Sequence, residues 1–130
     1  MKQLKVKVTK GPIPFRGYIM NFFGTILTRK PLKLSAKHMN HEGIHWHQQM
    51  DFVFGYEKLY ILGACIFYIL YGLEYLVKTV CKLFYWPIRS YRSVSFEQEA
   101  YLNDKNLQYQ DTRKRFAWLK YIFKIYRNVR

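Results

Sequence analysis

The chain has 130 residues, which is enough for one domain with a modest core and too few for two. Its 22 Lys and Arg residues face only 8 Asp and Glu residues, and the net charge of +14 predicts an anionic partner. No segment resembles a nucleic-acid-binding module, and the aromatic residues cluster with aliphatic ones, so we do not expect nucleic acid as that partner. We expect an anionic membrane surface instead.

Cysteine usage and the N-terminus predict where the chain works. Cys65 and Cys81 lie among apolar residues, and we interpret them as small buried hydrophobic side chains in a reducing compartment. Residues 1–20 contain no continuous apolar run, so we expect no cleaved signal peptide. These features predict the cytoplasmic face of a membrane, with the soluble cytoplasm as the alternative.

The N-terminal part of the chain predicts a short β-sheet. Residues 2–9 alternate between apolar residues and lysines, a pattern typical of a half-buried strand. Residues 17–28 are rich in aromatic and β-branched residues and predict one or two further strands, with a bend at Gly24.

The next segment carries a His-Glu-x-x-His run in a predicted helix that begins after the N-cap candidate Ser35. His41 and His45 are one helical turn apart, so both imidazoles can bind one metal ion. Glu42 lies about 100° around the helix from His41 and can reach a water molecule on that ion. The alternative is an exposed polar helix face. Gly43 mildly favours it, unless a neighbour comes close there.

Two other residues share the face of the histidine pair. His38 precedes His41 by one turn, and Gln48 follows His45 at three residues. A catalytic zinc ion keeps one coordination position open, so we expect these two residues to hydrogen-bond a ligand or to lie at the surface. His47 points away from this face, and we assign it no role.

A catalytic zinc site needs a third protein ligand, and two glutamates in the C-terminal third are candidates. Ser95 and Gln98 have the spacing of a capping box, which predicts a second helix running from Ser95 towards Asp111. Glu97 and Glu99 lie about 200° apart on that helix, so only one of them can face the histidines. The spacing alone does not decide which.

The run His41 to His45, followed by Glu97-x-x-Ala100, resembles the gluzincin metallopeptidases. It is most similar to the membrane-embedded branch with the CAAX prenyl proteases and the heat-shock membrane protease. The resemblance implies that Glu97 is the third zinc ligand and that Glu99 faces solvent or hydrogen-bonds a ligand. It also implies a minimal zincin-like domain over residues 1–130, of class α+β, with a short N-terminal sheet followed mainly by helices.

The second motif departs from the family at one position. The family has an Asp there that hydrogen-bonds a ligating histidine, and this chain has Tyr101. Such partners fix the tautomer and orientation of a ligand, and Asp104, on the same helix face as Glu97, is the candidate substitute. Tyr101 is itself a candidate catalytic residue that donates a hydrogen bond to a developing oxyanion.

In zincin-type folds the strand before the active-site helix is an edge strand that can pair with an extended substrate. The resemblance gives this role to the strand from Thr25 to Arg29. The alternative is an ordinary edge strand, blunted by Arg29, Lys30 and Pro31.

Residues 52–88 are the most apolar part of the chain, and Leu59 to Leu73 is nearly free of charge. A single membrane crossing would separate His45 from Glu97, and the interval between them is too short for two crossings, which need about 40 apolar residues plus a turn. We therefore expect one long helix, or a helical hairpin broken near Gly72, set shallowly in lipid. The alternative is a soluble hydrophobic helix covering a small sheet.

The C-terminal tail, residues 113–130, mixes aromatic and aliphatic residues with Lys and Arg. This pattern predicts a basic amphipathic helix at a membrane surface. The alternative is a plain surface helix packed on the domain.

These observations favour a zinc-dependent metallohydrolase, a peptidase in the leading hypothesis, acting on a peptide or protein substrate. His41, His45 and Glu97 bind Zn²⁺, and Glu42 deprotonates the bound water. The alternative is a membrane-associated binding or structural protein with a non-catalytic metal site, which Tyr101 and Gly43 motivate.

Overall fold

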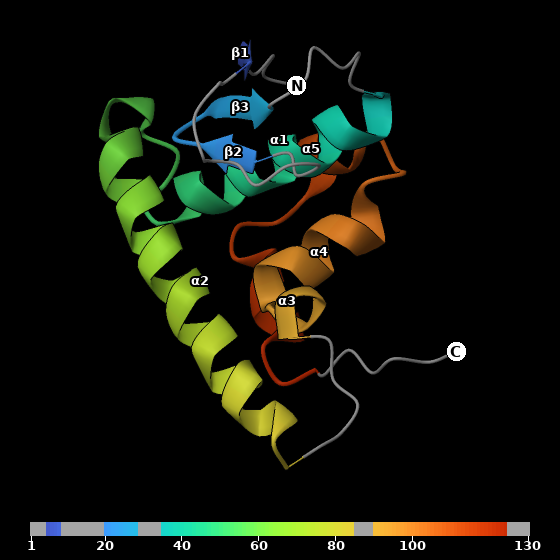
Figure 1. Cartoon of the computed structure of the whole chain (residues 1–130). Helices are drawn as coiled ribbons and strands as arrows, with labels where there is room; N and C mark the ends of the chain where they lie inside the picture. Colours follow the sequence, from blue (N-terminus) through green and yellow to red (C-terminus); the bar gives the residue numbers. More distant parts are fainter. Residues whose placement is uncertain (1–4, 9–19, 29–34, 85–89, 125–130) are drawn as a thin grey trace.

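The fold is α+β, mostly helical with one short sheet, as the sequence predicts (Figure 1). The structure, a computed structural model, describes residues 5–8, 20–28, 35–84 and 90–124. Its elements in chain order are β1 (Lys5–Val8), β2 (Met20–Phe22), β3 (Thr25–Thr28), α1 (Ala36–Asp51), the 3₁₀ turn η1 (Glu57–Leu59), α2 (Tyr60–Lys82), α3 (Ser90–Ser93), α4 (Ser95–Asn103), α5 (Tyr109–Thr112) and the 3₁₀ turn η2 (Ala117–Tyr121).

The sheet has the strand order β1-β3-β2, with β1 parallel and β2 antiparallel to β3. Phe23 and Gly24 form the β2–β3 turn, both with positive φ (47° and 79°), as a two-residue hairpin loop requires. A side chain at Gly24 would collide with the Trp46 ring. The glycine at the predicted bend therefore also allows the sheet to pack closely against α1. The ends of the predicted first strand, residues 2–4 and Thr9, lie outside the described residues.

The prediction that Thr25 to Arg29 forms an edge strand is wrong. β3 is the central strand, because β1 pairs with its free side in parallel register, Lys5 opposite Thr25 and Val8 opposite Thr28. A parallel partner from far upstream leaves no local sequence signal, and β2 and β1 are the two edges. Arg29 itself lies outside the described residues.

Helix α1 lies between the sheet and α4 (Figure 1). Its predicted N-cap is confirmed, because the Ser35 hydroxyl accepts a hydrogen bond from the backbone N–H of His38 at 3.2 Å. One apolar cluster joins α1 to β3. Its buried members are Ile26, Trp46, Met50 and Val53. A second cluster joins α2, α4 and η2 and has the buried members Phe67, Val94, Phe96 and Trp118.

Helix α2 is continuous from Tyr60 to Lys82, so the predicted long helix is confirmed and the hairpin alternative is wrong. Gly72 lies on the side of the helix with open space around it and causes no break. The segment Glu57–Lys82 has the length and composition of a membrane-spanning helix, but most of it is exposed to solvent. Cys65 is exposed and Cys81 half-buried, so the prediction that both are buried is wrong.

The outer face of α2 is apolar along the helix. Its exposed members are Ile61, Leu62, Ile69, Leu70, Leu73, Tyr75, Leu76, Val77 and Val80. The charged residues in this stretch, Glu74 and Lys78, point inward and pair with each other at 2.6 Å. Lys78 also donates to the backbone carbonyl of Ser93. The charges therefore do not interrupt the apolar outer face.

The capping box predicted at Ser95 and Gln98 is wrong. Glu74 of α2 caps helix α4 instead, accepting from the backbone N–H of Ser95 at 2.8 Å and from its hydroxyl at 2.6 Å. A carboxylate at a helix N-terminus is favoured by the helix dipole. The Gln98 amide instead donates to backbone carbonyls, including those of Ser93 and Lys124, at 2.8 Å each.

Helix α4 is shorter than predicted and ends at Asn103. The side-chain amide nitrogen of Asn40 accounts for this end, because it donates to the backbone carbonyls of Asn103, Asp104 and Asn106 at 2.9–3.2 Å. These carbonyls bond to α1 rather than continuing a helix towards Asp111.

The predicted amphipathic tail helix is wrong over residues 113–124. The chain there turns at Phe116, with φ 58°, and continues as the short 3₁₀ turn η2, whose Trp118 and Tyr121 are buried. Trp118 packs against Phe96 with 4.5 Å between ring centroids. This segment is part of the core, and residues 125–130 lie outside the described residues.

Candidate metal centre

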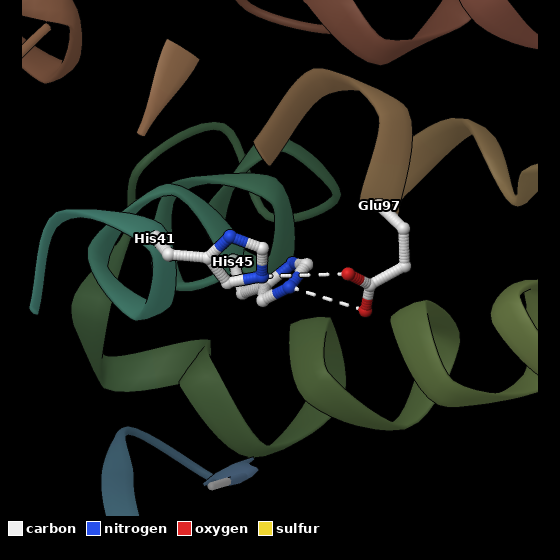
Figure 2. Close-up of side chains that lie close together, drawn as sticks. All are labelled: His41, His45 and Glu97. Carbon is white, nitrogen blue, oxygen red and sulfur yellow. Dashed lines mark ion pairs between the residues drawn. The ribbon is translucent and has the colours of Figure 1, made fainter. Parts of the chain in front are cut away.

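Three side chains predicted as metal ligands converge between α1 and α4 (Figure 2). The Nε2 atom of His41 lies 3.4 Å from one Glu97 carboxylate oxygen, and the Nε2 atom of His45 lies 3.3 Å from the other. All three residues are buried, and their candidate ligand atoms lie within 4.8 Å of one another. The prediction that these residues could hold one metal ion is therefore consistent with the geometry.

The donor set could hold a metal ion, and its chemistry is compatible with zinc. Two imidazole nitrogens and one carboxylate oxygen leave one of four tetrahedral positions open. Glu97 Oε2 is buried, and apart from its 3.4 Å ion pair with His41 Nε2 it has no hydrogen-bond partner among the described residues. A buried carboxylate oxygen without a hydrogen bond is costly in a protein, and a cation between it and the two Nε2 atoms would remove that cost.

The electrostatics of the site couple His45 to Glu97. Burial alone would lower the pKa of His45, but the negative charge and hydrogen bonding of Glu97, with a further contribution from Glu42, raise it to about 9. Burial would raise the pKa of Glu97, but the charges and hydrogen bonds of the two histidines hold it well below its usual range. The carboxylate is therefore ionised and ready to act as a ligand.

Gln48 orients His45, as predicted for a residue on the ligand face. The Oε1 atom of Gln48 lies 2.8 Å from Nδ1 of His45. Its Nε2 atom donates to the Phe96 carbonyl at 2.9 Å and to a Glu99 carboxylate oxygen at 3.0 Å. Both of these groups only accept, so the amide oxygen must face His45 and Nδ1 must carry a proton. When His45 loses one of its two ring protons, the one that remains lies on Nδ1, and Nε2 is the atom left to bind a metal ion.

Asp104 occupies the position expected for a substitute of the family Asp. Its Oδ2 atom lies 3.5 Å from Nδ1 of His41, on the side of the ring opposite the Nε2 that faces Glu97. Asp104 is buried, with Lys37 at 3.9 Å on the solvent side. The hydrogen bonds from Asn40 hold the segment that carries Asp104 against α1.

Tyr101 lies beside the candidate ligands. Its ring packs edge-to-face on His41, 4.6 Å between centroids, and the Arg92 guanidinium lies 4.2 Å from the Tyr101 ring centroid. Burial and the charge of Glu97 raise the pKa of Tyr101, so the phenol is neutral and can donate a hydrogen bond near pH 7. Glu42, the candidate base, is buried next to His41 on α1.

The glycine within the motif has a structural reason. A Cβ atom at Gly43 would overlap the side-chain amide of Gln110, which donates to Oδ1 of Asn40 at 2.7 Å. Gly43 is therefore the point of close approach between α1 and α5, and it does not favour an exposed polar helix. His38 is not brought to the site, because its ring contacts Ser35 at the exposed start of α1.

Several residues around the site were missed by sequence reasoning. The Tyr71 hydroxyl donates to Glu97 Oε1 at 2.8 Å from helix α2, which no motif marks. Its place on the inner face of α2, four residues after Phe67, is the signal that could have found it. Glu99 is fully buried, so its solvent-facing alternative is wrong, and Arg113 pairs with it at 2.8 Å.

No protein-family model, curated protein or solved structure matches this chain in the comparisons made with each. The site must therefore be interpreted from its own chemistry.

Proposed function

We propose that this protein is a zinc-dependent metallohydrolase, and specifically a peptidase with a minimal zincin-like fold. The observation that carries the proposal is the convergence of His41, His45 and Glu97, with both Nε2 atoms directed at the carboxylate. The resemblance of its two motifs to gluzincins supports peptide-bond hydrolysis as the reaction.

The roles of the residues follow from their positions. His41, His45 and Glu97 would hold the zinc ion, which would supply water activation and polarisation of the scissile carbonyl. Glu42 accepts the proton of the attacking water and passes it to the leaving amine. Tyr101 donates a hydrogen bond to the carbonyl oxygen as that oxygen gains negative charge.

Metal analysis followed by peptide-library digestion tests this proposal. We expect one zinc ion per chain, lost in His45→Ala and in Glu97→Ala. Glu42→Gln should keep the zinc and lose hydrolysis, because this carboxylate serves the water and not the ion. His38→Ala is the matched control and should keep both. Full zinc occupancy without cleavage of any peptide would favour the alternative function, a binding or structural protein with a non-catalytic metal site.

We further propose that α2 attaches the protein to an anionic membrane surface. The apolar outer face of α2 has no partner among the described residues, and Lys58 and Lys82 flank it at the two ends. A basic chain with such an apolar face is suited to shallow insertion into anionic lipid. The same observation supports the second candidate function, membrane binding without catalysis.

The proposed orientation of α2 is parallel to the membrane surface. The rest of the domain packs along α2, from Gly63 against Gln49 to Lys78 against Ser93. A crossing helix would carry this domain into the hydrocarbon, where each charged side chain at the centre costs about 3 kcal/mol. A helix lying in the interface avoids that cost.

Sedimentation with liposomes tests the attachment. We expect binding to vesicles of phosphatidylserine and phosphatidylcholine that rising salt only partly reverses, since insertion of the outer face is not screened. The double variant Ile69→Glu/Leu73→Glu should stay in the supernatant. Tail truncation is unsuitable, because it removes the buried residues Arg113 and Trp118. Wild-type protein that remains monodisperse and unbound with both anionic and neutral vesicles would contradict this proposal.

A further inference from the structure

We infer that Glu99 is a positioning residue for the metal centre, acting on His45 through Gln48. Glu99 does not belong to the group of candidate ligands, since its carboxylate is engaged by Gln48, Tyr109 and Arg113. The inference rests on the proposed metal site and deepens it, because it assigns a function to a glutamate two residues from the third ligand.

We call the series of contacts from Glu99 through Gln48 to His45 the relay. Its first step is the orientation of the Gln48 side-chain amide. A side-chain amide can rotate by 180° and exchange its oxygen for its nitrogen. Here the Phe96 carbonyl and the Glu99 carboxylate both accept from Gln48 Nε2, at 2.9 and 3.0 Å. In the rotated amide the oxygen would face two acceptors in a fully buried position, so Glu99 disfavours that orientation strongly.

The second step is the choice of tautomer at His45. Gln48 Oε1 can only accept, so in the neutral, metal-binding form of His45 the remaining proton lies on Nδ1 and donates to it, and Nε2 is left as the metal-binding atom. A rotated Gln48 would present N–H groups to Nδ1 and favour a proton on Nε2, which would block the ligand atom. The charge on Glu99 thus keeps His45 competent to bind.

The third step is the support of Glu99 itself. Arg113 donates to both of its oxygens, from Nε at 2.8 Å and from a terminal nitrogen at 3.2 Å, and Tyr109 donates at 2.9 Å. The same guanidinium makes a bidentate pair with Asp51 at 2.9–3.0 Å. Arg113 therefore holds two buried carboxylates, of which only Glu99 contacts Gln48.

This arrangement supplies a matched control. Glu99→Gln removes the charge that orients Gln48, whereas Asp51→Asn removes an equivalent partner of Arg113 without touching Gln48. Gln48→Met is a second variant that deletes the relay and keeps the side-chain volume. Zinc affinity by chelator competition and the exchange rate of the His45 Nδ1 proton by NMR are measured for all three, after circular dichroism shows that each folds.

We expect Glu99→Gln and Gln48→Met to weaken zinc binding about 10- to 100-fold, the usual range for residues that orient a ligand. Both should expose the His45 Nδ1 proton to fast exchange, while Asp51→Asn should match the wild type in both measurements. Unchanged zinc affinity and slow exchange in folded Glu99→Gln or Gln48→Met would overturn the inference. So would an equal loss in Asp51→Asn. A wild-type chain that binds no zinc would refute the proposed function, while the exchange measurement still decides the relay.

Discussion

Helices α1 and α2 both depart from the usual polarity of a soluble helix, α1 by the polar side chains that it buries and α2 by the apolar side chains that it exposes. The buried residues of α1 are mostly polar or charged and include both histidines, Glu42, Gln48 and Asp51. In α2 the apolar residues of the outer face are exposed, and the buried positions include the charged Lys78. A stable soluble helix normally shows the reverse arrangement.

The difference shows that neither helix is optimised for the stability of an isolated domain. Each buried polar group of α1 needs a partner, because an unsatisfied one costs about 1–3 kcal/mol. Each exposed apolar side chain of α2 forgoes about 25 cal/mol per Å² of burial. The metal site proposed on α1 and the lipid contact proposed on α2 would account for both departures.

The largest expected effect concerns the ion pairs that support α1. Arg113→Met leaves Asp51 and Glu99 buried without their cation and should lower the free energy of unfolding by about 3–5 kcal/mol. Urea denaturation measures this loss. The control Arg115→Met removes an exposed cation that packs on Phe54 and should change stability by less than about 0.5 kcal/mol. Similar free energies of unfolding for the two variants would show that the ion pairs of Arg113 with Asp51 and Glu99 do not stabilise the fold.

A second experiment compares the two faces of α2. Phe67→Ala on the inner face should cost about 3–5 kcal/mol, since Phe67 packs among Phe96 and Tyr71 in the core. Ile69→Ala on the outer face should cost less than about 0.5 kcal/mol in solution. Thermal unfolding without lipid measures both. A large loss from Ile69→Ala would mean that the outer face is buried in the free protein, for example in an oligomer.

The third prediction concerns pH. Because the pKa of His45 is about 9, this residue is protonated at pH 7, and zinc must displace that proton from the site. Zinc affinity should therefore rise roughly tenfold per pH unit from pH 7 and level off above pH 9, about 1.4 kcal/mol for each unit. Calorimetry in buffers of different ionisation enthalpy measures the released proton. His38→Ala should leave the release unchanged. Affinity that is constant between pH 7 and 8.5 would contradict the ion pair of His45 with Glu97.

The smallest effect is expected at the contact between α2 and the third ligand. Tyr71→Phe removes one hydrogen bond to the Glu97 carboxylate and should lower zinc affinity about tenfold, or about 1.4 kcal/mol. Tyr75→Phe, one turn further along on the outer face, is the matched control and should have no effect. Equal zinc affinities of both variants and the wild type would show that the contact of Tyr71 with Glu97 does not contribute to zinc binding.

The centre of the site could be predicted from sequence because it depends on local periodicity. Helical spacing places His41 with His45 and Asp104 with Glu97, and both pairs lie as expected. The choice of Glu97 over Glu99 needed the family resemblance, since the spacing left it open. The supporting contacts were not predictable, because they join segments far apart in the chain.

Three failures have this common origin. Glu74 replaces the predicted capping box of α4, β1 turns β3 into a central strand, and Arg113 draws the basic tail into the core. In each case a contact with a residue far away in the sequence determines the structure, in place of the local sequence pattern on which the prediction was based. The hydrophobic pattern of α2 gave its length but not its orientation, because exposed and buried apolar residues look alike in a sequence.

Glu74 has a further consequence, since it ties α2 to the first turn of the helix that carries Glu97. Together with the Tyr71 bond to Glu97 and the close packing of Gly63 on Gln49, it joins α2 to helices α4 and α1 at three points along its length. A slide of α2 by one helical turn, about 5.4 Å, would break all of these contacts. If α2 lies in lipid as proposed, the domain must move with it as one rigid body, and the tilt of α2 would set how far the three candidate ligands lie above the hydrocarbon.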